Sequence, residues 1–100
     1  MNAEEKRHLV KFFINKFEAI PEDRWCSGVL QDHHGRKCAL GHTFSLVPNN
    51  ETEKLCELFA GEYSGWHTVA MINNGDSSYR QPTEKARILA ALHDKLKECL

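Results

Sequence analysis

The segment that decides the fold runs from Arg24 to His42 and reads RWCSGVLQDHHGRKCALGH. It holds one tryptophan, two cysteines, three histidines and three glycines, so core packing, metal binding and thiol chemistry all compete to explain it. The glycines favour turns and close backbone approach over phosphate binding, because they lack the spacing of a phosphate loop. The segment therefore specifies either a fold or a reactive site.

Within this segment the sequence predicts a short β-hairpin. Residues 25–30 alternate as a strand does, and residues 36–38 suit a return strand. Asp32 and Gly35 stand at the first and fourth positions that are typical of a type I turn. A lone two-stranded hairpin is marginal in water, so we expect it to lie against helices.

The preceding residues predict a helix over residues 3–18, with Asn2 in a capping-box pattern at its start and Pro21 beyond its end. Phe12 lies off the apolar stripe, and it either widens the buried face or is exposed for a partner. The stripe follows helical spacing and consists of Leu9, Val10, Phe13, Ile14, Phe17 and Ile20.

The C-terminal part of the chain predicts a second long helix, with Pro82 at its first position. Its buried stripe consists of Ile88, Leu89, Leu92, Leu96 and Cys99. Between the two long helices, residues 39–47 predict a short buried helix or turn. Residues 50–61 predict another helix, with a capping-box pattern at Asn50. Residues 66–72 fit a helix or a strand, and we favour the helix.

These elements predict one domain over residues 1–100 of α+β class, mainly α. Long N- and C-terminal helices pack around a short β-hairpin and one or two short helices. The composition, with 41% hydrophobic and 27% charged residues, is that of a globular protein. A net charge of -1 gives no general nucleic-acid footprint. The charged start and the absence of a long apolar run predict a cytoplasmic protein with no membrane span and with thiols rather than disulfides.

Two chemical hypotheses involve the cysteines. Cys38 and His42 are four residues apart, which places both on one face of a helix, where the imidazole could activate the thiol. Alternatively, Cys26, Cys38 and His42 bind zinc together with His33 or His34. The twelve-residue separation of the two cysteines departs from the ligand pairs of structural zinc sites, and buried inert thiols are the commoner case. We therefore expect no cofactor.

Two polar regions are candidate surfaces for a protein partner. At the hairpin tip we name His33, His34 and Arg36, and in the loop after residue 73 we name Asn74, Asp76 and Tyr79. The cluster that begins at Asn73 either stops a helix or contacts the Cys/His block or a partner. The two tryptophans are expected to anchor the core. The alternative is a small-molecule pocket between the long helices, walled by Trp25 and Trp66.

Three blocks of sequence carry a resemblance to a known family. They are Trp25-Cys26-x-Gly28 with Asp32-x-x-Gly35-Arg36-x-Cys38-Ala39-Leu40-Gly41, then Ile72-Asn73-Asn74-Gly75, and then PTEKARILAAL at residues 82–92. Over residues 5–96 the chain resembles a family of small proteins from bacteria and their phages that is classed as a domain of unknown function. The resemblance implies no established activity or cofactor.

Two departures from that family bear on the chemistry. Its members often have Asp at the position of Asn74, and some have a small residue at the position of His42. A shared Cys-His dyad or zinc site is therefore disfavoured. We expect a phage-encoded interaction module, not an enzyme, that binds and inhibits a host or phage protein such as a defence or replication factor. The alternative is a metal-binding or cysteine-dependent catalytic protein.

Overall fold

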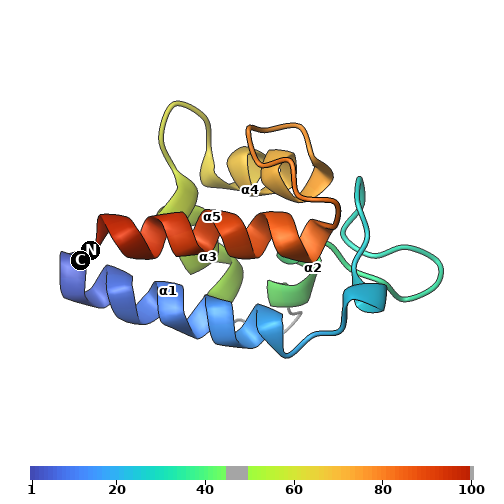
Figure 1. Ribbon diagram of the computed structural model, residues 1–100, viewed down its shortest axis with the longest axis horizontal. Helices are drawn as coiled ribbons and strands as arrows, with labels where there is room; N and C mark the ends of the chain where they lie inside the picture. The colour runs from blue at the N-terminus through green and yellow to red at the C-terminus, as the bar shows by residue number, and fades with distance from the viewer. Residues whose placement is uncertain (45–49, 100) are drawn as a thin grey trace.

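The computed structural model describes residues 1–44 and 50–99. In these ranges the chain forms five α-helices and one 3₁₀ helix, and it contains no β-strand. The elements are α1 (Ala3–Glu18), η1 (Glu22–Arg24), α2 (Ala39–Thr43), α3 (Glu51–Phe59), α4 (Gly65–Asn74) and α5 (Glu84–Glu98). Figure 1 shows α1 and α5 lying side by side and antiparallel.

The fold is an all-helical bundle, so the predicted α+β class and the predicted β-hairpin are wrong. Residues 24–38 form an irregular loop in which Lys37 makes single bridges, parallel to Trp25 and antiparallel to Gln31. Backbone hydrogen bonds close the loop on itself at these bridges, such as the one from the Cys26 N–H to the Lys37 carbonyl at 3.0 Å, but they do not extend into a strand pair. Further backbone groups of the segment bond to side chains of α4. We call this segment the 24–38 loop; it projects at one end of the molecule in Figure 1.

Helix α1 confirms the predicted N-terminal helix. The Asn2 side chain caps it by accepting a hydrogen bond from the Glu5 N–H at 2.8 Å. Of its predicted stripe, Val10, Phe13, Ile14 and Phe17 are buried, and Leu9 and Ile20 are partly buried. Phe12 is 47% exposed, so the stripe is not widened at that position.

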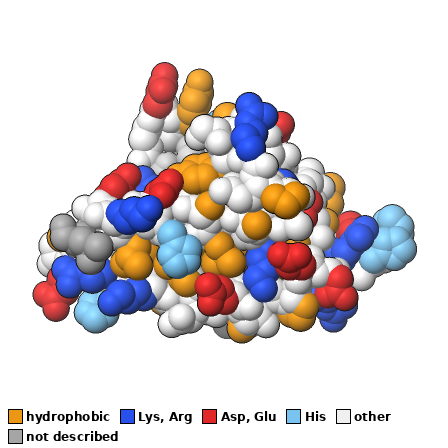
Figure 2. All heavy atoms as spheres, in the orientation of Figure 1, with side chains coloured by type: hydrophobic (Ala, Val, Ile, Leu, Met, Phe, Trp, Pro, Cys, Tyr) orange, Lys and Arg blue, Asp and Glu red, His pale blue; other side chains and the backbone are white. Residues whose placement is uncertain are grey.

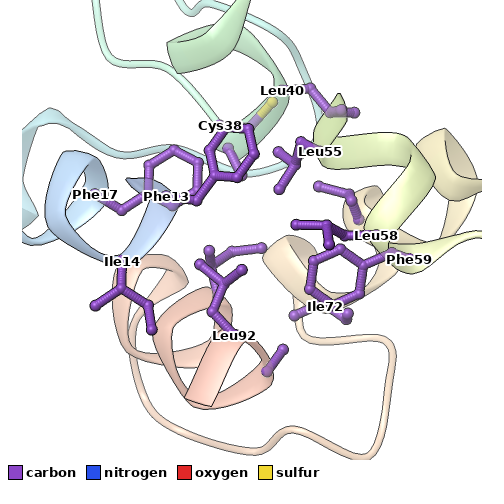
Figure 3. Close-up of a cluster of buried hydrophobic side chains, with 14 of the residues drawn as sticks. Phe13, Ile14, Phe17, Cys38, Leu40, Leu55, Leu58, Phe59, Ile72 and Leu92 are labelled. Atoms are coloured by element: carbon purple, nitrogen blue, oxygen red, sulfur yellow. The ribbon is translucent and has the colours of Figure 1, made fainter. Parts of the chain in front are cut away.

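The core is one continuous cluster of apolar side chains from all five α-helices (Figure 3). Helix α5 packs against both α1 and α4, and it contributes Ile88 and Leu92, which are fully buried. Its N-cap is Thr83, whose hydroxyl accepts from the Ala86 N–H, so Pro82 precedes the helix instead of opening it. A threonine side chain can satisfy one of the N–H groups at the helix start, which proline cannot do.

The prediction of a helix instead of a strand over residues 66–72 is confirmed, since these residues lie within α4. This helix approaches α3 closely, because a Cβ on Gly65 would lie 1.7 Å from the Cys56 carbonyl oxygen. Asn50 precedes α3 with a positive φ of 60° and no side-chain cap, so the capping box expected there is wrong. Of the short element predicted over residues 39–47, α2 confirms a buried helix, and residues 45–47 lie outside the described residues.

None of the helices in the described ranges is both long and apolar enough to cross a membrane.

Candidate functional site

A buried polar network on α4 holds the 24–38 loop in place. Asn73 lies in the last turn of α4 and is 1% exposed. Its Oδ1 accepts from the Ala39 N–H and its Nδ2 donates to the Cys26 carbonyl, both at 3.0 Å. One side chain therefore binds the backbone near each end of the loop, and it satisfies buried groups that would otherwise be costly.

Asn74 extends this network to the middle of the loop. Its Oδ1 accepts from the Gly28 N–H and from the Asn73 Nδ2, each at 3.0 Å. Gly28 has a φ of 84°, a conformation that glycine adopts without steric cost. The Asn73-Asn74 cluster thus contacts the Cys/His block, which was one of the two interpretations of its sequence. The other interpretation, that this cluster stops a helix, also holds, because α4 ends at Asn74 and Gly75 is its C-cap.

Arg87 joins α5 to the same network. Its Nε and Nη2 donate to the Asn73 carbonyl at 3.2 and 2.8 Å, and its Nη1 donates to the Gln81 carbonyl at 2.9 Å. These bonds satisfy a carbonyl at the C-terminal end of α4 with a cation, which also complements the helix dipole. No sequence pattern predicts this role of Arg87, because its target is a backbone atom fourteen positions away.

Cys38 and His42, the two groups of the thiol-activation hypothesis, make separate contacts. Cys38 is the N-cap of α2, and its Sγ accepts from the Gly41 N–H at 3.4 Å. The His42 ring instead packs against Trp25, with ring centroids 4.6 Å apart. In the part of the chain that the structure describes, no hydrogen bond joins the Cys38 thiol to this imidazole.

The environments of these groups also disfavour ionisation. Burial, assisted by the charge of Lys37, lowers the pKa of His42 to about 4, and among the described residues the buried Nε2 has no hydrogen-bond partner. Burial raises the pKa of the Cys26 thiol, and nearby Asp32 raises it further. Cys26 donates instead to the Arg36 carbonyl at 3.3 Å. Over residues 1–44 and 50–99, no three His, Cys, Asp or Glu side chains are grouped as metal ligands would be.

The tip of the 24–38 loop carries the first set of predicted partner contacts. His33 and His34 are exposed, with ring centroids 4.0 Å apart. Figure 2 shows histidine side chains at the same end of the molecule. Arg36 is held by Asp32, whose Oδ2 accepts from its Nε at 2.7 Å, and the Gly35 N–H donates to the Asp32 carbonyl as in the predicted turn. Partner binding by the tip stays a prediction.

The second set of predicted contacts divides between the surface and internal bonds. Asp76 is exposed after the end of α4. Asn74 is engaged by the loop backbone. The Tyr79 hydroxyl donates to the Asp94 carboxylate at 2.7 Å, and burial with this bond raises the pKa of Tyr79 to about 12. Of this set, Asp76 alone presents a polar side chain without an internal partner within the described residues.

An exposed apolar pocket lies where the 24–38 loop meets α4. We call it the Trp66 socket. Its volume is about 140 Å³, its floor includes Cys38 and Leu40, and its rim includes Val29, Leu30, Trp66 and Ala70. Val29 is 52%, Leu30 38% and Trp66 44% exposed. The expectation that both tryptophans anchor the core holds for Trp25 alone, which is 4% exposed. Trp25 and Trp66 line different concavities.

No protein-family model, curated protein or solved structure matches this chain. The family resemblance of the sequence therefore stays a prediction. The blocks that carry it are those that the Asn73, Asn74 and Arg87 network joins.

Proposed function

We propose that the chain is a protein-binding module whose contact surface is the Trp66 socket. The observation that carries this proposal is the exposure of Val29, Leu30 and Trp66 around a pocket with an apolar floor. Single exposed apolar residues are ordinary on a protein surface, but a group of them that includes a tryptophan and lines one pocket is typical of an interaction site.

The size of the socket favours a side chain of another protein over a small molecule. Its volume of about 140 Å³ lies below the roughly 300–1,000 Å³ that small-molecule sites usually have. A pocket of this size accommodates one large apolar side chain. Tryptophan beside such a pocket is among the residues that contribute most to binding energy at protein interfaces.

The socket is rigidly supported, which favours binding because little entropy is lost on association. The Gly28 N–H is held by Asn74, and the Leu30 carbonyl accepts from the Cys38 N–H at 3.3 Å. The loop backbone also lies directly on α2, since a Cβ on Gly41 would be 2.0 Å from the Leu30 oxygen. The backbone that carries Val29 and Leu30 is therefore held on both sides by hydrogen bonds.

The identity of the partner rests on the family resemblance alone. We propose a host or phage protein, such as a defence or replication factor, which the module inhibits by occupying its surface. A cytoplasmic location belongs to the same proposal.

Selection from a random peptide library displayed on phage tests the binding proposal. We expect peptides that bind the protein and lose at least ~30-fold in affinity when Trp66→Ala is introduced, as loss of an interface hot spot implies. Phe12→Ala is the matched control, because Phe12 is similarly exposed but lies on α1. Bound peptide should also protect Trp66 from acrylamide quenching. Peptides that bind both variants as well as the unmodified protein would overturn the proposal.

Zinc binding by Cys26, Cys38 and His42 stays the alternative prediction. Metal analysis of protein purified without added zinc, beside a Cys38→Ala variant, tests it. A stoichiometric metal that the variant loses would replace the interaction proposal. No metal in either protein, with folding unchanged, would eliminate the alternative.

A further inference from the structure

A second concavity is lined by other residues of the 24–38 loop. We call it the acidic groove. Its volume is about 440 Å³, and the residues that line it include Glu22, Asp23, Ser27, Asp32, Arg36 and Glu84. Ser27 lines the groove and Gly28 lines the socket, so the two concavities meet at consecutive residues. A segment whose apolar side chain enters the socket can therefore reach the groove by crossing Ser27 and Gly28.

The groove carries an excess of negative charge after its internal ion pairs are counted. Arg36 is the one cation among its described lining residues, and Asp32 binds it at 2.7 Å. Glu84 lies 3.8 Å from the Arg87 Nη2 and accepts from the Ser27 hydroxyl at 2.7 Å. Both of these carboxylates are therefore at least partly compensated.

Glu22 and Asp23 are the other two carboxylates that line the acidic groove. Neither forms an ion pair with a described residue, and both are exposed on η1. Glu22 accepts one long hydrogen bond, 3.4 Å, from the Thr83 hydroxyl. These two exposed carboxylates attract cations and repel anions at short range. Arg24 lies on the same 3₁₀ helix but does not line the groove.

From this charge and its position we infer that the partner segment presents a large apolar side chain next to lysine or arginine residues. The inference rests on the proposed function, which supplies the socket, and it adds the chemistry of the partner. The apolar side chain occupies the Trp66 socket, and the basic residues lie along the acidic groove near Glu22 and Asp23. Complementary charge of this kind selects among partners and increases the rate of association.

Three synthetic peptides with one apolar anchor, and with flanking residues that are basic, neutral or acidic, test this inference. Affinity is measured from the fluorescence anisotropy of dye-labelled peptides, a readout that the Trp66→Ala variant also gives, at low and at high salt. We expect the basic peptide to bind about 3- to 10-fold more tightly than the neutral one at low salt and the acidic peptide to bind most weakly. These differences should shrink at high salt, because exposed charges are screened.

A double substitution, Glu22→Gln with Asp23→Asn, removes the two charges without touching the socket. We expect it to reduce binding of the basic peptide about 2- to 10-fold and to leave the neutral peptide unchanged. Trp66→Ala, in contrast, should reduce binding of both peptides. Equal binding of all three peptides, with dependence on Trp66 retained, would overturn the basic-partner inference alone.

Failure of every anchored peptide to bind in a Trp66-dependent way would overturn the socket proposal itself. A second copy of the chain is the other occupant to be tested. Sedimentation of the protein alone should give a monomer. A dimer that Trp66→Ala dissociates would overturn the inference in favour of self-association.

Discussion

The α1–α5 pair and the 24–38 loop are stabilised in different ways. The two helices meet through apolar side chains that recur at helical spacing. Substitution of one of these side chains by another of similar volume and polarity is therefore tolerated. The loop is positioned by single hydrogen-bonding atoms, above all the two ends of the Asn73 amide. The helices therefore depend on side-chain volume and pattern, whereas the loop depends on the identity of individual atoms.

The largest effect is expected in the helical region. Phe13→Ala should lower the free energy of unfolding by about 3–5 kcal/mol, because it removes a fully buried aromatic ring and leaves a cavity. Urea denaturation followed by circular dichroism measures this loss. Phe12→Ala is the control, and it should cost about 1 kcal/mol or less because that ring is half exposed. Similar losses from the two substitutions would contradict the packing described for α1.

An atom-specific effect is expected in the loop. Asn73→Asp keeps the shape of the side chain but replaces the Nδ2 donor with an acceptor that faces the Cys26 carbonyl. We expect a loss of about 2–4 kcal/mol, since a buried carbonyl loses its partner and a charge is buried. Amide hydrogen exchange should increase over the 24–38 loop more than in α1.

Asn74→Asp is the matched control for that substitution. Asn74 uses only its Oδ1, which accepts two hydrogen bonds, and a carboxylate oxygen can do the same. The cost should be about 1 kcal/mol or less, arising from a negative charge at the C-terminal end of α4. Equal losses for Asp at the two positions would show that the loop does not depend on the Asn73 donor.

The smallest effect concerns pH. His42 has a pKa of about 4 in the folded protein, below its ordinary value of 6.5, because of burial and the charge of Lys37. The unfolded chain therefore binds more protons between these values, and stability falls as pH decreases from about 6.5 to 4. Allowing for solvent screening of a partly exposed ring, we expect a loss of roughly 1 kcal/mol.

Comparison with His42→Phe isolates this contribution. The variant keeps a ring against Trp25 but cannot titrate. Urea denaturation at pH 7 and pH 4.5 should show a smaller decrease in stability for the variant than for the unmodified protein. An identical decrease would place the acid sensitivity in other groups.

The sequence predicted the two regions unequally. The periodicity of Phe13 and Phe17, and that of Ile88 and Leu92, is local, and it predicted α1 and α5 and their buried faces. The 24–38 loop was predicted as a hairpin because its local alternation and its turn residues suit one. The competing hydrogen bonds come from Asn73, more than thirty positions away, and no local pattern predicts them.

The candidate site was predictable only in part. Contact between the Asn73 cluster and the Cys/His block was one of the alternatives that the sequence suggested. The hydrogen bond from Arg87 to the Asn73 carbonyl was not predicted. It also expected Trp66 in the core. Helical periodicity does not reveal exposure at the first turn of a short helix, where burial depends on how α4 packs on α3.

The end of α4 also has a consequence for how the protein ages. An Asn-Gly sequence ordinarily deamidates when the glycine nitrogen attacks the asparagine side chain and forms a succinimide. Here the Gly75 N–H is bonded to the Ile72 carbonyl, and the Asn74 amide is held by Gly28. We expect the folded chain to lose this amide slowly and the unfolded chain to lose it fast. The extent of deamidation in a stored sample, read by mass spectrometry, would therefore record how long its molecules have spent unfolded.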